Sequence, residues 1–97
     1  MRTMMRVTIP VEPGNAAIKS GRLPQLMGEA MARMKPEAAY FTADNGARSA
    51  YFFLDLRDQS DIPVYAEPFF MELNASIEFM PVMNADDLKK GLSQISR

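Results

Sequence analysis

The segment AAYFTADNGARSAYFFLDL, residues 38–56, carries the clearest local structural signal in this chain. Asn45-Gly46 is a preferred dipeptide for two-residue hairpin turns, because both turn positions require a positive φ angle. The residues on either side have the strand-forming composition of two antiparallel strands. A turn at this dipeptide predicts four cross-strand pairs: Thr42 with Ser49, Phe41 with Ala50, Tyr40 with Tyr51, and Ala39 with Phe52.

Both faces of the predicted hairpin carry aromatic side chains. One face has a core composition and consists of Ala39, Phe41, Ala50, Phe52, Leu54 and Leu56. The other combines large aromatic residues with hydroxyls and one acid, and consists of Tyr40, Thr42, Ser49, Tyr51, Phe53 and Asp55. A sheet with one solvated face usually places polar residues there. The aromatic residues on the second face therefore indicate that it is covered as well.

The part of the chain before the hairpin reads as a strand followed by a helical segment. Residues 3–11 alternate in the manner of a strand, and the PGN sequence at 13–15 predicts a turn in which Asn15 caps the next helix. Residues 16–34 have helical periodicity, which Gly21 and Pro24 interrupt, so we expect a short first piece and a main helix from about Leu23. The Lys-Pro sequence at 35–36 ends it.

The part after the hairpin predicts a helix, a strand and a terminal helix. DQSDIP at 58–63 begins a helix, since Ser60 or Asp61 can cap it and proline is tolerated in a first turn. Residues 75–83 alternate as a strand, and Pro81 favours a place at the edge of the sheet or the end of the strand. Asn84 then caps a short helix, whose apolar stripe consists of Leu88, Leu92 and Ile95.

The order β-α-β-β-α-β with an extra C-terminal helix predicts an α+β, ferredoxin-like fold in a single domain, residues 1–97. The expected sheet order is 4-1-3-2, with the first and third strands central and parallel to each other and both main helices on one side. The predicted core face consists of Met5, Val7, Ile9, Phe41, Phe52, Leu54, Ile77 and Phe79.

The opposite sheet face is predicted to be uncovered by the main helices. It consists of Met4, Arg6, Thr8, Tyr40, Thr42, Ser49, Tyr51, Phe53, Asp55, Glu78, Met80 and Val82. Its apolar part exceeds the patch of about 300 to 600 Å² that a monomer usually exposes. Either the terminal helix folds under this face or a second subunit stacks on it. We favour a homodimer or higher oligomer, because two-fold symmetry is the commonest way to cover such a surface.

Three segments resemble proteins of the dimeric α+β barrel superfamily: MKPEAAYFT at 34–42, YAEPFF at 65–70 and EFMPVMNADDL at 78–88. That superfamily includes muconolactone-isomerase-like and antibiotic-monooxygenase-like proteins and many small bacterial proteins of unknown function. The resemblance covers nearly the whole chain at the level of the fold. It implies a dimer with paired sheets but transfers no catalytic motif, and the haem-degrading branch uses a histidine ligand that this chain lacks.

Composition argues against several classes of function. The chain has no cysteine and no histidine, which excludes a disulfide framework, a thiol nucleophile, a Cys/His zinc site and a histidine general base. Its 11 basic and 12 acidic residues are spread evenly, so we expect no nucleic acid and no membrane surface as partner. No cofactor or metal motif is visible, and the acidic residues Asp44, Asp58, Asp61, Asp86 and Asp87 are assigned to turns and caps. A cytoplasmic location is the default expectation.

Candidate site residues gather on the uncovered sheet face. Arg6, Asp55 and Glu78 could anchor an anionic ligand beside an acid or base, or could form an ion-pair cluster that neutralises itself. Tyr40 and Tyr51 could clasp a planar ligand or donate a proton, or could simply pack in an interface. The leading hypothesis is a homodimer that binds a small, partly apolar organic ligand between its sheets. The alternatives are a non-enzymatic interaction module and a cofactor-independent isomerase or monooxygenase-like enzyme.

Overall fold

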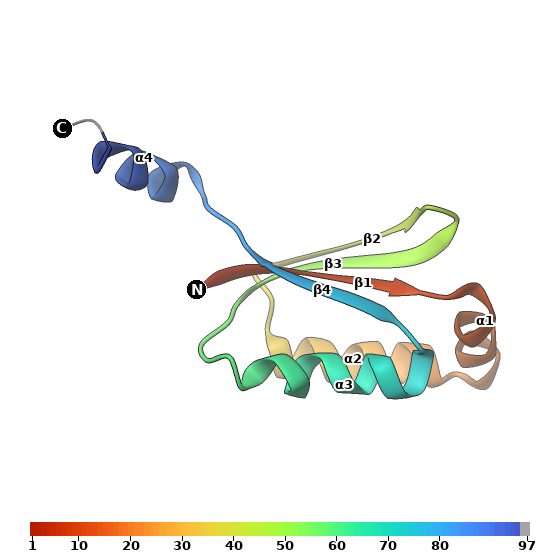
Figure 1. Ribbon diagram of the computed structural model, residues 1–97. Coiled ribbons are helices and arrows are strands. Elements are labelled where there is room, and N and C mark those ends of the chain that lie inside the picture. Colours follow the sequence, from red (N-terminus) through yellow and green to blue (C-terminus); the bar gives the residue numbers. More distant parts are fainter. Residues whose placement is uncertain (96–97) are drawn as a thin grey trace.

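The computed structural model describes residues 1–95, and within them one four-stranded antiparallel sheet carries helices on one face (Figure 1). The strands are β1 (Arg2–Ile9), β2 (Ala38–Asp44), β3 (Ala47–Asp55) and β4 (Ser76–Pro81). Their order is β2-β3-β1-β4, which is 4-1-3-2 when read from the opposite edge, so β1 and β3 are central. The α+β class and a ferredoxin-like arrangement are therefore confirmed.

The expected parallel arrangement of the two central strands is wrong. β1 pairs antiparallel with β3 and also with β4, and β2 pairs antiparallel with β3. The reason lies in the connections. The helical crossover after β1 returns the chain to the end of the sheet where β1 began, so β2 runs in the direction of β1, and the tight hairpin then reverses β3 between them.

The hairpin has the predicted turn and register. Asn45 and Gly46 both have positive φ angles, of 53° and 77°. All four predicted pairs occur, from Thr42 opposite Ser49 to Ala39 opposite Phe52. Because strand faces alternate with a period of two, this register fixes which side chains of β2 and β3 share a face.

The first helix begins five residues earlier than predicted. β1 ends at Ile9, and α1 (Val11–Ser20) contains the PGN sequence that was expected to form a turn. Pro13 lies in the first turn, where the missing N–H costs little. Asn15 is consequently not a cap; its Oδ1 accepts a hydrogen bond of 2.9 Å from Nη2 of Arg48. Gly21, with φ of 80°, separates α1 from α2 (Arg22–Met34) as expected.

A single core lies between the sheet and the two long helices, α2 and α3 (Asp61–Leu73). On the outside of the helix layer, Arg22 joins α2 to α3 through two bonds to Glu72, of 2.5 Å from Nε and 2.7 Å from Nη2. The Arg22 guanidinium lowers the pKa of the Glu72 carboxyl. The largest buried side chains of the core are Met5, Val7, Leu26, Phe52, Leu54, Phe69 and Leu73.

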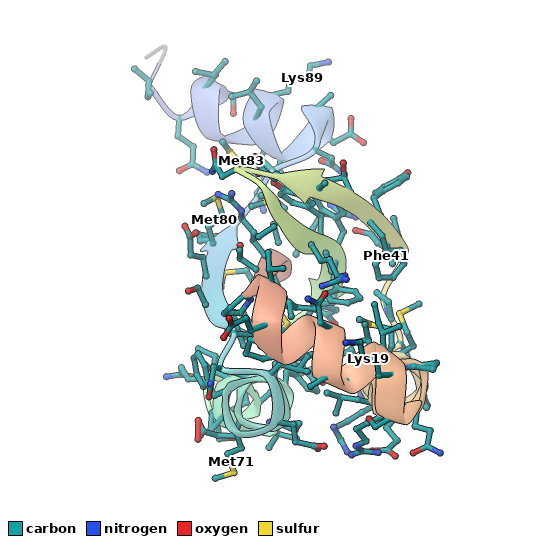
Figure 2. All side chains as sticks on the ribbon, turned by 90° about the vertical axis from the view of Figure 1, so that its right-hand side faces the viewer. Lys19, Phe41, Met71, Met80, Met83 and Lys89 are labelled. Carbon is teal, nitrogen blue, oxygen red and sulfur yellow. The ribbon has the colours of Figure 1, made fainter. Side chains whose placement is uncertain are left out.

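One residue of the predicted core is exposed. Phe41 has the expected register, opposite Ala50, but keeps 57% of its surface exposed. It belongs to β2, an edge strand, and its ring makes an edge-on contact with Phe52 at 6.0 Å between centroids. Figure 2 shows Phe41 and Met80 on opposite sides of the molecule, at the β2 and β4 edges. The core is thus narrower than the sheet.

The terminal helix α4 (Ala85–Ser93) stands away from the rest of the chain (Figure 1). Asn84 caps it as predicted: its side chain accepts a bond from the Asp87 N–H at 2.8 Å, and Asp87 returns the contact in a capping box. No residue of α4 is buried. The alternative in which this helix folds under the sheet is not the arrangement observed.

Candidate functional site

We call the sheet surface opposite α2 and α3 the open face; it consists of Met4, Arg6, Thr8, Tyr40, Thr42, Asp44, Ser49, Tyr51, Phe53, Glu78 and Met80. No helix of the described chain covers it in Figure 1. The strand registers place four sequence-predicted site residues in one row across the sheet, in the order Tyr40, Tyr51, Arg6 and Glu78.

Arg6 occupies the middle of the open face and is largely covered there. Its side chain is 26% exposed. Nη2 donates a hydrogen bond of 2.7 Å to Oδ2 of Asp44, and Nη1 lies 3.7 Å from Oε1 of Glu78. The guanidinium also sits over the Tyr51 ring, 5.7 Å from its centroid. An arginine cannot lose its proton when it is covered, so these contacts supply the partners that its charge requires.

Asp44 is the site residue that the sequence analysis missed. Its Oδ2 accepts bonds of 2.7 Å from both Arg6 and the Tyr51 hydroxyl. Its place next to the turn made a local role the simpler interpretation. Strand alternation held the signal, because residues 38, 40, 42 and 44 share one face and Asp44 therefore lies on the same side as Tyr40.

The hydrogen bond to Asp44 also sets the protonation of Tyr51. This bond raises the pKa of the Tyr51 phenol, burial raises it further, and the charge of Arg6 opposes both. The phenol is therefore held as a hydrogen-bond donor and is a weaker acid than a free tyrosine. We call Arg6, Asp44, Tyr51 and Glu78 the Arg6 cluster; its formal charges are one positive and two negative.

Asp55 does not belong to this cluster. It lies at the end of β3, opposite Arg2, and its Oδ1 accepts a bond of 2.6 Å from the N-terminal ammonium of Met1. This bond lowers the pKa of the Asp55 carboxyl. Of the two carboxylates expected beside Arg6, only Glu78 is there, because the register places Asp55 two rows away.

Tyr40 and Tyr51 are opposite each other but lean in different directions. The Tyr51 hydroxyl reaches toward the turn, to Asp44, while the Tyr40 ring makes an edge-on contact with Phe53 at 6.4 Å. Phe53 lies on the far side of Tyr51 from the turn. The two rings do not form a clasp in this chain, and Tyr40 remains 64% exposed.

Two open clefts lie outside the Arg6 cluster. The larger, of about 590 Å³, is at the end of the sheet where α4 leaves, and its apolar lining consists of Met1, Leu54, Pro81, Val82 and Met83. The smaller, of about 270 Å³, lies between the ends of α2 and β3 and the start of α3 and is lined by Arg33, Arg57 and Tyr65 among others. Neither adjoins Arg6 or Tyr51.

Within residues 1–95, no three histidine, cysteine, aspartate or glutamate side chains come together in a group that could hold a metal ion. None of the helices in that range has both the length and the apolar character needed to cross a membrane.

Comparison with known proteins gives no family. No protein-family model, no curated protein and no solved structure matches this chain.

Proposed function

We propose that this protein works as a homodimer in which two open faces stack on each other, in the manner of a dimeric α+β barrel. The observation that carries the proposal is a largely covered, ion-paired arginine in the middle of a sheet face that no helix within residues 1–95 covers. Around it lie Met4, Phe53, Tyr40 and Met80, the last two 64% and 42% exposed. Aromatic residues, methionine and arginine are the residue types in which protein interfaces are enriched relative to the rest of the surface.

The Arg6 cluster would fix how the two copies align. Arg6 is paired with Asp44 and lies near Glu78, so stacking would cover its guanidinium together with a carboxylate partner. An alignment that leaves Glu78, which is 59% exposed, in contact with water or a donor is favoured over one that covers it with apolar side chains. The cluster therefore favours one alignment of the two sheets.

Sedimentation of two matched variants tests this proposal. Phe53→Asp puts a carboxylate into the open face, and Met71→Asp puts the same group on α3, where Met71 is 77% exposed on the other side of the molecule (Figure 2). We expect wild type and Met71→Asp to sediment at twice 10.9 kDa and Phe53→Asp to sediment as a monomer. A monomeric wild type at tens of micromolar, or an unchanged Phe53→Asp dimer, would reject the proposal.

The second candidate function is the binding of a small, partly apolar organic molecule between the stacked sheets. The exposed ring of Tyr40 beside Phe53 favours it, because together they offer an aromatic floor. Since the Arg6 cluster has two carboxylates for one guanidinium, a neutral ligand suits it better than an anion. Tyr51 donates its hydroxyl proton to Oδ2 of Asp44, so its oxygen would accept a hydrogen bond from the N–H or O–H group of such a ligand.

Thermal-shift measurements with benzamide and benzoate distinguish this candidate from a purely structural interface. Ligand binding predicts that benzamide raises the melting temperature of the wild type more than benzoate does, and that Tyr40→Ala abolishes the rise while the dimer persists. If neither probe stabilises the wild type more than the Tyr40→Ala variant, the interface has no site for this class of ligand.

A further inference from the structure

Helix α4 has the features of a helix that packs, although the described chain buries none of it. Leu88 and Leu92 lie one turn apart in α4, Ile95 follows two residues after the end of the helix, and the three side chains, which we call the apolar stripe, are 47%, 53% and 78% exposed. The helix is well specified at its ends, with the capping box at Asn84, acids in the first turn and Lys90 in the last. Nine residues alone are too few for a stable helix in water, so its stability must come from packing.

The root of α4 is held in a direction that leads away from its own sheet. The backbone N–H of Val82 donates to the carbonyl of Arg2 at 3.1 Å, which extends the pairing of β4 beyond Pro81. The side chain of Arg2 then reaches Asp87 in the first turn, with Nη1 3.4 Å from Oδ2. The two contacts of Arg2 thus lie at the two ends of the short linker between β4 and α4.

The larger cleft lies where a partner's helix could enter. We call it the root groove; its apolar floor includes Leu54, Pro81 and Val82, and its rim carries both charge signs, in Lys35 and Glu37. Met83 and Asp87, at the start of α4, form part of its wall, so the same α4 leaves the groove rather than filling it. One chain therefore presents an exposed apolar stripe and an open apolar groove that it does not join.

We propose that the two copies of the homodimer exchange these helices, each α4 packing its apolar stripe into the root groove of the other copy. This rests on the proposed stacking of open faces. Figure 1 shows α4 on the side of the sheet opposite α2 and α3, beyond the strand ends. A stacked sheet lies about 10 Å away, and a nine-residue helix is about 14 Å long, so α4 reaches the partner's sheet end. A two-fold axis makes both contacts at once.

The size of the open face also favours this exchange. Four strands of about seven residues give a face of roughly 450 Å² in projection. A standard stable interface buries about 800 Å² of accessible surface on each partner, a quantity larger than the projected area of the same face, so contacts beyond the sheet would add to what stacking buries. Two α4 stripes and two root grooves add apolar surface at the same end of the sheet, and they remove from water side chains that stacking alone leaves exposed.

Substitutions in the α4 stripe test the exchange. The double variant Leu88→Gln, Ile95→Gln replaces two of the three apolar side chains of the stripe with a good helix former, and Lys90→Gln introduces the same residue on the opposite side of α4. We expect the double variant to raise the dimer dissociation constant at least tenfold and Lys90→Gln to leave it within threefold. Equal effects of the two would overturn the exchange.

Crosslinking between introduced cysteines shows where α4 packs, and because the chain has no native cysteine, only the introduced residues can react. A Lys89→Cys chain is mixed with a larger, tagged Glu37→Cys chain and treated with a short bismaleimide. We expect a mixed dimer on a denaturing gel, and none when the tagged chain carries Lys19→Cys, which lies in α1 at the other end of the strands (Figure 1). Because Arg2 contacts both Glu37 and Asp87 of its own chain, a crosslink within one chain does not count against the exchange, whereas absence of the mixed Lys89→Cys, Glu37→Cys dimer would overturn it.

These results separate failure of the exchange from failure of the stacking. If Phe53→Asp dissociates the dimer and the α4 double variant does not, the open faces pair and the exchange is wrong. If only the α4 double variant dissociates it, the helices exchange without stacked sheets. A wild type that is monomeric at tens of micromolar would reject both the stacking of the open faces and the exchange of α4.

Discussion

Each of the four strands contributes one side chain to the Arg6 cluster: Arg6 from β1, Asp44 from β2, Tyr51 from β3 and Glu78 from β4. The shared oxygen of Asp44 makes the arginine and the phenol depend on one carboxylate. Nε of Arg6 is covered and has no hydrogen-bond partner among the described residues. Such a group is normally expensive to bury. The contacts of the two guanidinium amino groups with Asp44 and Glu78 therefore offset only part of the cost of covering Arg6.

The tyrosine of this cluster gives a pH test. The pKa of Tyr51 is raised in the folded chain, whereas an unfolded tyrosine ionises near 10. The folded state then binds more protons above about pH 10, so unfolding becomes more favourable as pH rises. We expect the stability advantage of wild type over Tyr51→Phe to be constant below about pH 9 and to shrink above it, measured by urea unfolding from pH 8 to 11.

Tyr65→Phe, in α3, is the control for loss of a phenol. A wild-type advantage over Tyr51→Phe that is the same at pH 8 and pH 11 would mean that the bond between Tyr51 and Asp44 does not persist in solution.

At the scale of the elements, a short sequence predicted the local structure correctly where its residues favour a single conformation. Asn45-Gly46 strongly favours one backbone conformation, the two-residue hairpin turn, so the hairpin and its four pairs could be predicted. The PGN sequence is compatible with two local structures, because proline and glycine suit a turn and proline also suits a first helical turn. Packing decides between them: Gly14 is buried, and an added Cβ would lie 2.6 Å from Nη1 of Arg48. That tertiary contact is invisible in the sequence around residue 14.

The site shows the same division between local and long-range information. Strand alternation placed Arg6, Tyr40, Tyr51 and Glu78 on one face, and the register then aligned them in a row. Strand alternation could not show that Asp44, at the strand end, contacts Arg6, because the direction of a side chain along a twisted sheet depends on its neighbours. The direction of the central strands was recoverable from connectivity alone, since a hairpin must reverse the chain.

The turn itself can be tested by one substitution. Gly46 has φ of 77°, and an added Cβ would meet no other atom within 4 Å. The cost of Gly46→Val therefore comes from the backbone, about 1 to 2 kcal/mol for a side chain in the left-handed region. Gly28→Ala, in the middle of α2 where space is also open, should instead stabilise by about 0.5 to 1 kcal/mol.

Chemical denaturation of both glycine variants measures these changes. If Gly46→Val proved as stable as wild type, the turn would have to lie elsewhere in solution, and the assignment of side chains to the open face would have to be revised.

The whole molecule is longer than a compact chain of its size. Its radius of gyration is 15.6 Å, and its extents are 58 × 27 × 18 Å. A compact domain of 97 residues has a radius of gyration of about 12.5 Å. The excess comes from α4, which lies beyond the end of the sheet (Figure 1). An elongated chain with an exposed stripe and an open sheet face buries less of its apolar surface than its length allows, so association with a second copy would supply part of its stability.

This dependence on association predicts a melting temperature that rises with protein concentration. If the folded state is a dimer and the unfolded state is monomeric, a hundredfold rise in concentration stabilises the dimer by about 2.7 kcal/mol. For a folding unit of two such chains, that corresponds to a rise of roughly 5 to 10 °C. Differential scanning fluorimetry from 1 to 100 µM measures it directly.

The variants used above provide the controls for this measurement. Met71→Asp should keep the full concentration dependence, because Met71 lies on the outer side of α3, away from both proposed contacts. Phe53→Asp and the α4 double variant should each reduce it, since each removes part of the surface that the partner covers. If the melting temperature of the wild type is the same at 1 and 100 µM, the open face and α4 contribute nothing to folding through a second copy, and the single chain is stable with both surfaces exposed.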